Sequence, residues 1–224
     1  MNKQNLELRK ALIAGALRIK ACGLGRGTSG NLSVRAAENG ENGFLVTPSG
    51  MPYDTLTPDD IVFMRLDGTS AGQRKPSSEW RIHRDLYAHR NEAQAILHAH
   101  SPFATSLSCL HRDIPAFHYM TARFGGNSVR CASYATFGTQ ELSAAALRAM
   151  LDRSACLLSN HGMLVFGSDV SHALCLGVEL EELCEHYWRA SLIGHPVILT
   201  DSEMKVIVEK FAAYGQQSQN EKRI

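Results

Sequence analysis

An apolar stripe marks the start of the chain. Leu8, Leu12, Ala16 and Ile19 recur every three or four residues, while the charged residues Arg9, Lys10 and Arg18 lie on other faces. Because residues at this spacing share one side of a helix, the pattern predicts an amphipathic helix that ends near Gly23.

Five short apolar runs predict strands. The runs NLSVR, GFLVTP and IVFMRLDG fall within residues 31–68 and are separated by Gly, Asn, Asp and Pro, which is typical of strands joined by turns. AQAILHAH follows at 93–100, and ACLLSNHG at 155–162 is expected to be a strand that breaks at Asn160.

Five further segments carry helical spacing or helix-start signals. They are 77–89 with Ser77 or Ser78 as N-cap, 102–110 with Pro102 in its first turn, 139–153 with Thr139 as N-cap, 171–193 with one apolar stripe, and 200–215 with a capping box of Thr200 and Glu203 and a stop at Gly215. Helices and strands intermingle along the chain. This order predicts a single α/β domain over residues 1–215, with helices packed on a central sheet, followed by a polar tail at 216–224.

Charge and composition exclude several classes of function. The net charge is +1 without a long block of like charge, so there is no electrostatic case for a nucleic-acid or anionic-membrane partner. The N-terminal segment lacks both a signal-peptide core and a membrane-spanning run, and we expect a cytoplasmic protein with a small-molecule partner. The six cysteines show no C-x-x-C spacing, which argues against a zinc ribbon or a redox motif.

Two histidines at the end of a predicted strand are candidate metal ligands. His98 and His100 are separated by one residue, so on a strand their side chains project from the same face. Neutral imidazole is a common zinc ligand, but a pair without a third ligand is also compatible with purely structural roles.

Three loops rich in Gly, Ser and Thr are candidate anion sites. GRGTSG (25–30) matches the dinucleotide fingerprint, but a helix precedes it and a strand follows it, which is the reverse of the required order and argues against that function. The loops TPSG (47–50) and KPSSE (75–79) are similar in composition, and each alone is also typical of an ordinary turn. Because Ser77 and Ser78 fall where a helix begins, and Glu79 follows them, we expect a carboxylate beside an anion site.

Eight motifs carry a resemblance to a known family. GTSGNLSVR, TPSGMPYDTL, KPSSEWRIH, LHAHSP, IPAFHYM, GGNSV, YATFGT and SNHGMLVFG occur in an order and spacing similar to the class II, zinc-dependent sugar-phosphate aldolases, and most similar to the fuculose-phosphate aldolases among them. The resemblance implies a three-layer α/β/α sandwich with a largely antiparallel sheet. It further implies one Zn²⁺ per subunit, held by His98, His100 and His161, with Glu79 as acid/base group and as a metal contact before substrate arrives.

The resemblance also implies a phosphate cradle and a shared active site. The residues that match the phosphate cradle are Gly30, Asn31, Ser49, Gly50, Ser77 and Ser78, and Lys75 beside them is a candidate phosphate contact. Tyr119 matches a second proton-transferring group that reaches a neighbouring subunit's site in a homotetramer. The aromatics that match the aldehyde end are Phe137, Phe211 and Tyr214.

The function implied is reversible cleavage of a ketose 1-phosphate, of the L-fuculose 1-phosphate type, to dihydroxyacetone phosphate and a small aldehyde. A close alternative is an aldolase for 5-deoxyribulose or 5-methylthioribulose 1-phosphate. More distant alternatives in the same family are a sugar-phosphate 4-epimerase, a dehydratase and a non-catalytic scaffold like the adducin head. The scaffold should lack the metal ligands, and this chain has all of them.

Overall fold

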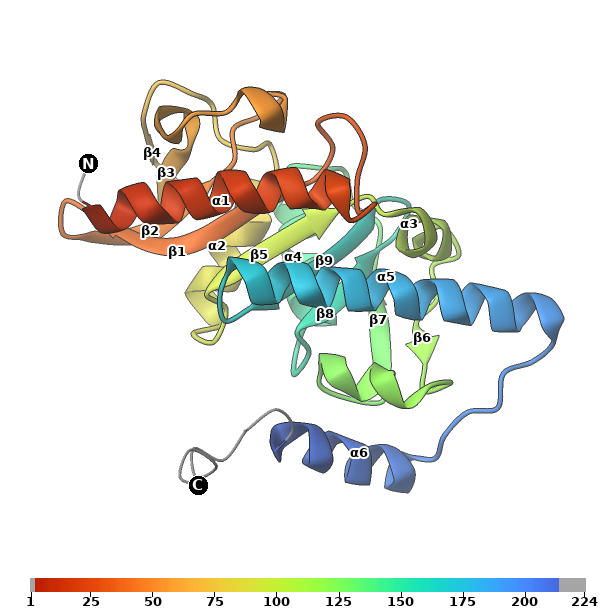
Figure 1. Cartoon of the computed structure of the whole chain (residues 1–224). Coiled ribbons are helices and arrows are strands. Elements are labelled where there is room, and N and C mark those ends of the chain that lie inside the picture. Colours follow the sequence, from red (N-terminus) through yellow and green to blue (C-terminus); the bar gives the residue numbers. More distant parts are fainter. Residues whose placement is uncertain (1–2, 214–224) are drawn as a thin grey trace, which may run out of the picture.

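The computed structural model describes residues 3–213, and its centre is one nine-stranded sheet (Figure 1). The strands are β1 (Asn31–Glu38), β2 (Glu41–Val46), β3 (Val62–Arg65), β4 (Ser70–Ala71), β5 (Ala95–Ala99), β6 (Ile114–Pro115), β7 (Ser128–Ala132), β8 (Ala155–Leu158) and β9 (Gly162–Gly167). Their spatial order is β4-β3-β2-β1-β5-β9-β8-β7-β6. Every pair is antiparallel except β7 with β8, which confirms the expected largely antiparallel sheet.

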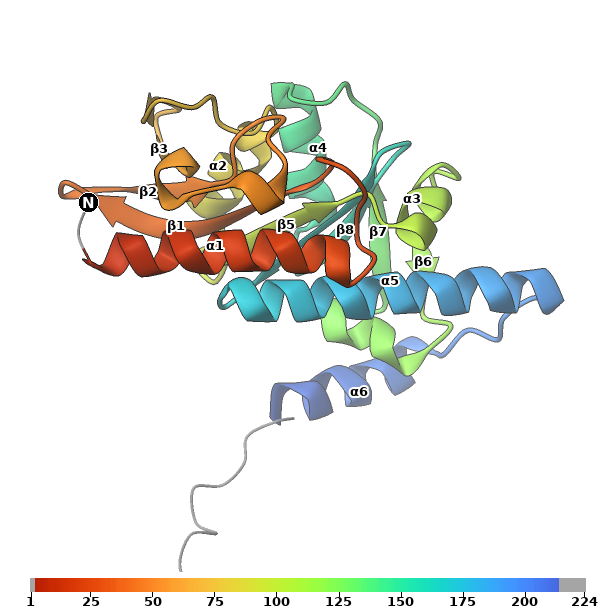
Figure 2. The same cartoon turned by 45° about the horizontal axis from the view of Figure 1, so that its top comes forward.

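Helices cover both faces of this sheet. The α-helices are α1 (Lys3–Ala21), α2 (Trp80–His89), α3 (Pro102–Ser108), α4 (Gln140–Ala149), α5 (Val170–Ile193) and α6 (Asp201–Ala213), and the 3₁₀ turns are η1 (Tyr53–Thr55), η2 (Pro58–Asp60) and η3 (Tyr119–Phe124). Figures 1 and 2 show α1 and α5 side by side on one face, with α2 and α4 on the other. This is the expected three-layer arrangement.

Alternation along the strands builds a separate core on each face. Within β5, Leu97 packs into the cluster that contains the stripe of α1 and α5, whereas its neighbour Ile96 packs into the cluster with α2 and α4. Both side chains are fully buried. Because successive strand residues point to opposite faces, a nearly continuous apolar run supplies both cores. The central strands are therefore held rigidly from both sides.

Most predicted elements are present, with two corrections at their ends. The caps predicted at Thr139 and at Thr200 with Glu203 are confirmed, but α4 ends at Ala149, before the predicted residue 153. The prediction that Ser77 or Ser78 caps α2 is wrong, because the helix begins at Trp80 and Glu79 occupies the cap position. Ser77 instead lies in the preceding loop, where its Oγ accepts a hydrogen bond from the Glu79 amide.

Four strands and the C-terminal end differ from the prediction or lie beyond its test. The strands β4, β6, β7 and β9 were not predicted. The expected stop at Gly215 and the tail at 216–224 lie outside the described residues. Among the helices of the described part, none is long and apolar enough to cross a membrane.

Candidate active site

The pairing of β5 with β9 brings three histidines together. His98 lies near the end of β5, His100 follows that strand directly, and His161 lies in the turn between β8 and β9. His98 pairs with Leu164 and Ala99 with Met163, so the start of β9 runs beside the end of β5. The preceding residue Asn160 has a φ of 53°, a left-handed conformation that Asn adopts more readily than most residues. This tight turn directs His161 toward the other two imidazoles.

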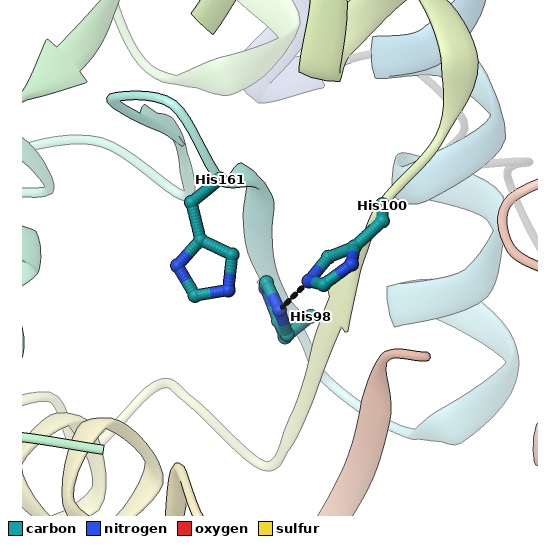
Figure 3. Close-up of side chains that lie close together, drawn as sticks. All are labelled: His98, His100 and His161. Carbon is teal, nitrogen blue, oxygen red and sulfur yellow. Dashed lines mark hydrogen bonds between the residues drawn. The ribbon is translucent and has the colours of Figure 1, made fainter. Parts of the chain in front are cut away.

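The three rings converge on one point, as Figure 3 shows. Their centroids are 4.7–4.9 Å apart, and the rings meet edge to face. One nitrogen from each ring lies within 4.8 Å of the other two. His98 is completely buried, whereas His100 and His161 are partly exposed and open the cluster to solvent. The structure thus brings the two histidines predicted from strand geometry together with the third one implied by the resemblance.

Glu79 completes this cluster from the N-terminus of α2. Its Oε2 lies 3.1 Å from His98 Nε2, and its Oε1 lies 3.2 Å from His161 Nε2. Asn31 Nδ2 donates a hydrogen bond of 3.0 Å to Oε2, whereas Oε1 is buried and accepts no well-formed hydrogen bond within the described chain. A buried carboxylate oxygen without a donor calls for a cation or a further donor at this position.

The donor set fits a divalent cation. Neutral His98 donates Nδ1–H to the Met163 carbonyl oxygen at 2.9 Å, so its Nε2 carries a lone pair. That lone pair faces His100 Nε2 at 2.9 Å and the Glu79 carboxylate. Fixing one ring nitrogen on a backbone carbonyl while the other stays free is the usual preparation of a metal-ligating histidine. Three imidazoles with one carboxylate nearby match the ligand chemistry of zinc.

The pKa values also indicate that the site favours a bound positive charge. Burial raises the pKa of Glu79, but the charge and hydrogen bond of His98, the charge of His161 and the Asn31 amide lower it by more, so this pKa lies well below its usual range. Burial, followed by the charge of His98, lowers the pKa of both His100 and His161 to about 4. Burial also lowers the pKa of His98, but the Glu79 charge raises it above the ordinary value. A carboxylate anion among neutral imidazoles favours a positive charge beside it. Either a metal ion or a proton on His98 would balance the Glu79 charge.

A cleft of about 340 Å³ adjoins the histidines, and all six residues of the expected phosphate cradle line it. Two of the loops that carry them are tied together, because Ser49 N donates to Lys75 O and Ser77 N donates to Thr47 O. Gly30 has a φ of 88°, and a Cβ there would lie 2.8 Å from the His98 carbonyl oxygen. Glycine at residue 30 therefore lets the first loop approach the strand that carries the ligands. Lys75 is not among the residues that line the cleft.

Asn31 has a different environment from the other cradle residues. Its Nδ2 donates to Glu79, and its Oδ1 lies 2.5 Å from His83 Nε2. Both ends of the side chain are therefore used inside the protein, and the residue is buried. Its predicted contact with phosphate stays a prediction, and its contact with His83 was not predicted.

Of the predicted aromatic residues, the structure brings one to this cleft. Phe137 lines it, and its loop is anchored where Arg81 donates to the Gly138 carbonyl oxygen. The cleft also contains residues to which no role had been assigned, namely Tyr134, Ala135, Pro48 and Asn160. Tyr134 and Phe137 are 61% and 66% exposed, so this wall of the cleft offers apolar ring surface to a ligand.

Tyr119 and Phe211 lie elsewhere in the same chain. Their rings stack with centroids 6.3 Å apart and line a second cleft of about 570 Å³ with Arg123 and Lys210. Tyr119 is half exposed and is not among the residues that line the histidine cleft. An action of Tyr119 on a neighbouring subunit's site therefore stays a prediction. Tyr214 lies outside the described residues.

The chain is also similar to known proteins along almost its whole length. Residues 10–188 match the family model described as Class II Aldolase and Adducin N-terminal domain. The chain is 50% identical over 219 residues to the 5-methylthioribulose-1-phosphate/5-deoxyribulose-1-phosphate aldolase of Rhodospirillum rubrum, covering 98% of this chain and 97% of the relative. It is 43% identical over 210 residues to the L-fuculose phosphate aldolase of Escherichia coli K12, covering 93% and 96% of the two chains. A solved structure of an L-fuculose 1-phosphate aldolase superposes with a TM-score of 0.87 at 40% identity, covering 92% and 96%.

Proposed function

This chain belongs to the class II aldolase and adducin family, and from that membership we propose that it is a zinc-dependent aldolase that cleaves a ketose 1-phosphate to dihydroxyacetone phosphate and an aldehyde. The observation that carries the proposal is the convergence of three imidazole nitrogens and the Glu79 carboxylate beside a cleft rich in hydroxyl groups. A non-catalytic scaffold has no need for this set. Three neutral nitrogen ligands with a carboxylate suit zinc, and bound zinc supplies a Lewis acid for the carbonyl and hydroxyl oxygens of the substrate.

The protein groups supply binding and proton transfer. The loops around Ser49 and Ser77 hold the phosphate with backbone amides and hydroxyl groups, which orients the carbon chain toward the histidines. When the C3–C4 bond breaks, its electron pair stays with the dihydroxyacetone-phosphate fragment. The C4 hydroxyl passes its proton to the Tyr119 hydroxyl of a neighbouring subunit, which releases its own proton to solvent. Glu79, a carboxylate in the free site, takes up a proton from solvent and delivers it to C3. In net terms one proton moves from the C4 oxygen to C3, so the reaction needs no redox partner.

The substrate is proposed from the relatives and from the cleft. The R. rubrum relative carries the name of a 5-methylthioribulose-1-phosphate/5-deoxyribulose-1-phosphate aldolase, and we propose these two ketose phosphates as the first substrates. The exposed rings of Tyr134 and Phe137 suit an apolar methyl or methylthio end, and sulfur packs well on aromatic edges. L-Fuculose 1-phosphate is the second candidate, because relatives of that name are 43% identical.

A cleavage assay tests both levels of the proposal. The purified protein is incubated with 5-methylthioribulose, 5-deoxyribulose, L-fuculose and L-rhamnulose 1-phosphates, and released dihydroxyacetone phosphate is measured by a coupled reductase. We expect kcat/KM to be highest for 5-methylthioribulose and 5-deoxyribulose 1-phosphates. A higher kcat/KM for L-fuculose 1-phosphate overturns the substrate assignment alone. Absence of cleavage of all four by zinc-loaded protein, or an epimerised or dehydrated product, overturns the aldolase assignment.

A subunit-mixing experiment tests the shared site. Tyr119→Phe and Glu79→Gln proteins should each be nearly inactive. If Tyr119 acts on a neighbour, co-assembly restores sites that combine an intact Glu79 with an intact Tyr119, at about a quarter of all sites for random mixing in a closed oligomer. If Tyr119 acts within its own chain, mixing restores nothing.

A further inference from the structure

A buried series of hydrogen-bonded polar side chains leads to Glu79 from the core between the sheet and helices α2 and α4. Tyr87 OH lies 2.8 Å from Ser33 Oγ, which lies 2.6 Å from His83 Nδ1. On the other side of the ring, His83 Nε2 lies 2.5 Å from Asn31 Oδ1, and Asn31 Nδ2 lies 3.0 Å from Glu79 Oε2. These hydrogen bonds connect α2 to β1 and return to Glu79, the cap residue that precedes α2.

The acceptor at the end fixes the direction of every hydrogen bond. The Glu79 carboxylate only accepts, so the Asn31 amide turns its NH₂ toward Glu79 and its oxygen toward His83. His83 must then donate from Nε2, and a neutral ring accepts at Nδ1 from the Ser33 hydroxyl. Tyr87 in turn donates to Ser33 Oγ. Every donor thus points along the chain toward the carboxylate.

Burial and packing hold these groups in a single arrangement. Ser33 and His83 have no exposed surface, and Tyr87 and Asn31 are at most 3% exposed. Phe44 lies against the His83 ring at 16° between planes and against Tyr87 at a centroid distance of 5.1 Å. Burial also lowers the pKa of His83 to about 3, which agrees with a neutral ring. Water does not reach His83 to replace a lost partner.

We propose that His83 is a positioning residue for the reaction, because its Nε2–H holds the Asn31 amide in the one orientation that donates to Glu79. Without that donor the Asn31 amide can rotate and turn its oxygen toward the Glu79 carboxylate. The two oxygen acceptors then repel each other. The carboxylate would then leave the rotamer in which it faces both His98 and His161. The role rests on the proposed function, since it concerns the acid/base group of that reaction.

One measurement on the wild-type protein is independent of catalysis. Long-range ¹H–¹⁵N NMR spectra of the ¹⁵N-histidine-labelled protein, with and without zinc, report which ring nitrogen of His83 carries hydrogen. Replacement of His83 by Phe, or by Asn if the Phe variant does not fold, assigns the signal. The proposal requires a neutral Nε2–H ring between about pH 6 and pH 8, because burial holds its pKa far below that range. A neutral Nδ1–H ring or an imidazolium overturns the hydrogen-bond directions and the proposal with them.

Two variants of similar shape separate positioning from stability. His83→Phe removes the donor to Asn31, whereas Tyr87→Phe removes a buried hydroxyl two links farther away and leaves Ser33 free to donate to His83. Both should lower the melting temperature. His83→Phe should also lower kcat by about 10- to 100-fold, the usual loss for a group that orients a ligand, with KM changed less than about threefold. Tyr87→Phe should keep kcat within about threefold of wild type.

The outcomes distinguish this inference from the proposed function. Wild-type kcat in folded His83→Phe, or an equal loss in Tyr87→Phe, overturns the positioning role. If the wild-type enzyme cleaves no ketose phosphate, the proposed function fails. The NMR spectra then still show whether the hydrogen bonds run from Tyr87 toward Glu79. If His83→Phe does not fold, the tautomer measurement on wild type remains decisive.

Discussion

Substitution of Gly162 offers a direct test of the metal centre without replacing any proposed ligand. It begins β9, directly after His161, and its backbone passes close to the end of β5. A Cβ at this position would lie 2.4 Å from the Ala99 carbonyl oxygen and 3.1 Å from His100 Cδ2. Since ordinary contacts begin at 3.4 Å, Gly162→Ala forces the strands that carry the ligands apart by about 1 Å.

The size of the effect follows from the tolerance of metal coordination. Ligand distances in a metal site hold within about 0.2 Å, so a displacement of about 1 Å is several times too large for three ligands to be kept. We expect zinc affinity to fall at least about tenfold, with activity falling as zinc dissociates. Overpacking should also lower the free energy of unfolding by about 1–3 kcal/mol.

Gly167 at the other end of β9 provides the matched control. A Cβ there would lie 2.6 Å from the Ala173 amide nitrogen, so Gly167→Ala creates a comparable clash. The two glycines are separated by about 16 Å along the strand at its usual rise per residue. Gly167→Ala should therefore lose stability but keep zinc affinity.

The assay is a competition titration of metal-free protein against a chromophoric zinc chelator, with thermal unfolding measured on the same samples. The reasoning is refuted if Gly162→Ala binds zinc as tightly as wild type. It is equally refuted if Gly167→Ala loses as much zinc affinity, because the effect would then follow general destabilisation.

Three further outcomes are expected. Glu79→Gln should retain its fold and most bound zinc while turnover falls by about two to four orders of magnitude; near wild-type cleavage contradicts the acid/base role, and complete loss of zinc by elemental analysis makes the carboxylate chiefly a ligand. His98→Ala should lose both zinc and activity, since it removes a buried nitrogen donor. Hydrogen bonds from Thr57, then from Arg74, lower the pKa of Asp60 to about 2 in the folded protein. The Asp60 carboxylate therefore stabilises the fold at pH values above the pKa that Asp60 has in the unfolded chain. This contribution is lost as pH falls through the pKa of the folded state. Asp60→Asn should therefore lower the free energy of unfolding at pH 7 by about 1 kcal/mol, a value limited by the half-exposed Arg74; urea titrations should show a smaller difference near pH 3, and an unchanged difference contradicts the linkage.

How much of this molecule the sequence predicts depends on how local each signal is. The stripe of the first helix and the cap at Thr139 depend on residues three or four apart, and both are confirmed. β7 was not predicted, because it has only five residues, of which Ser128 and Arg130 are polar. Its place in the sheet depends on parallel pairing with β8, which is distant in sequence. β9 is a short apolar run with Gly at both ends, and periodicity does not identify such a run as a strand.

The active-site cluster shows the same limit. His98 and His100 are close in sequence, so strand geometry alone suggested a pair. His161 comes from the turn between β8 and β9, and only the family resemblance suggested it. The contact between His83 and Asn31 joins residues 52 positions apart, and neither belongs to a local motif that indicates it. Side chains whose partners are distant in sequence were the ones that sequence reasoning missed.

The charge distribution in the cleft connects the two halves of the proposed site. Among the described residues that line it there is no Lys or Arg, and Glu79 is its one carboxylate. The donors on the phosphate side are neutral amides and hydroxyl groups at the start of α2, where the helix dipole adds only a partial positive charge. With His100 and His161 neutral near pH 7, the positive charge that the histidines themselves can offer is one proton on His98, and the Glu79 carboxylate offsets it. Without a metal ion the site therefore offers a phosphate dianion no net positive charge. A divalent cation at the histidines would supply it, so the phosphate loops and the metal site depend on each other electrostatically even though the chain builds them from separate elements.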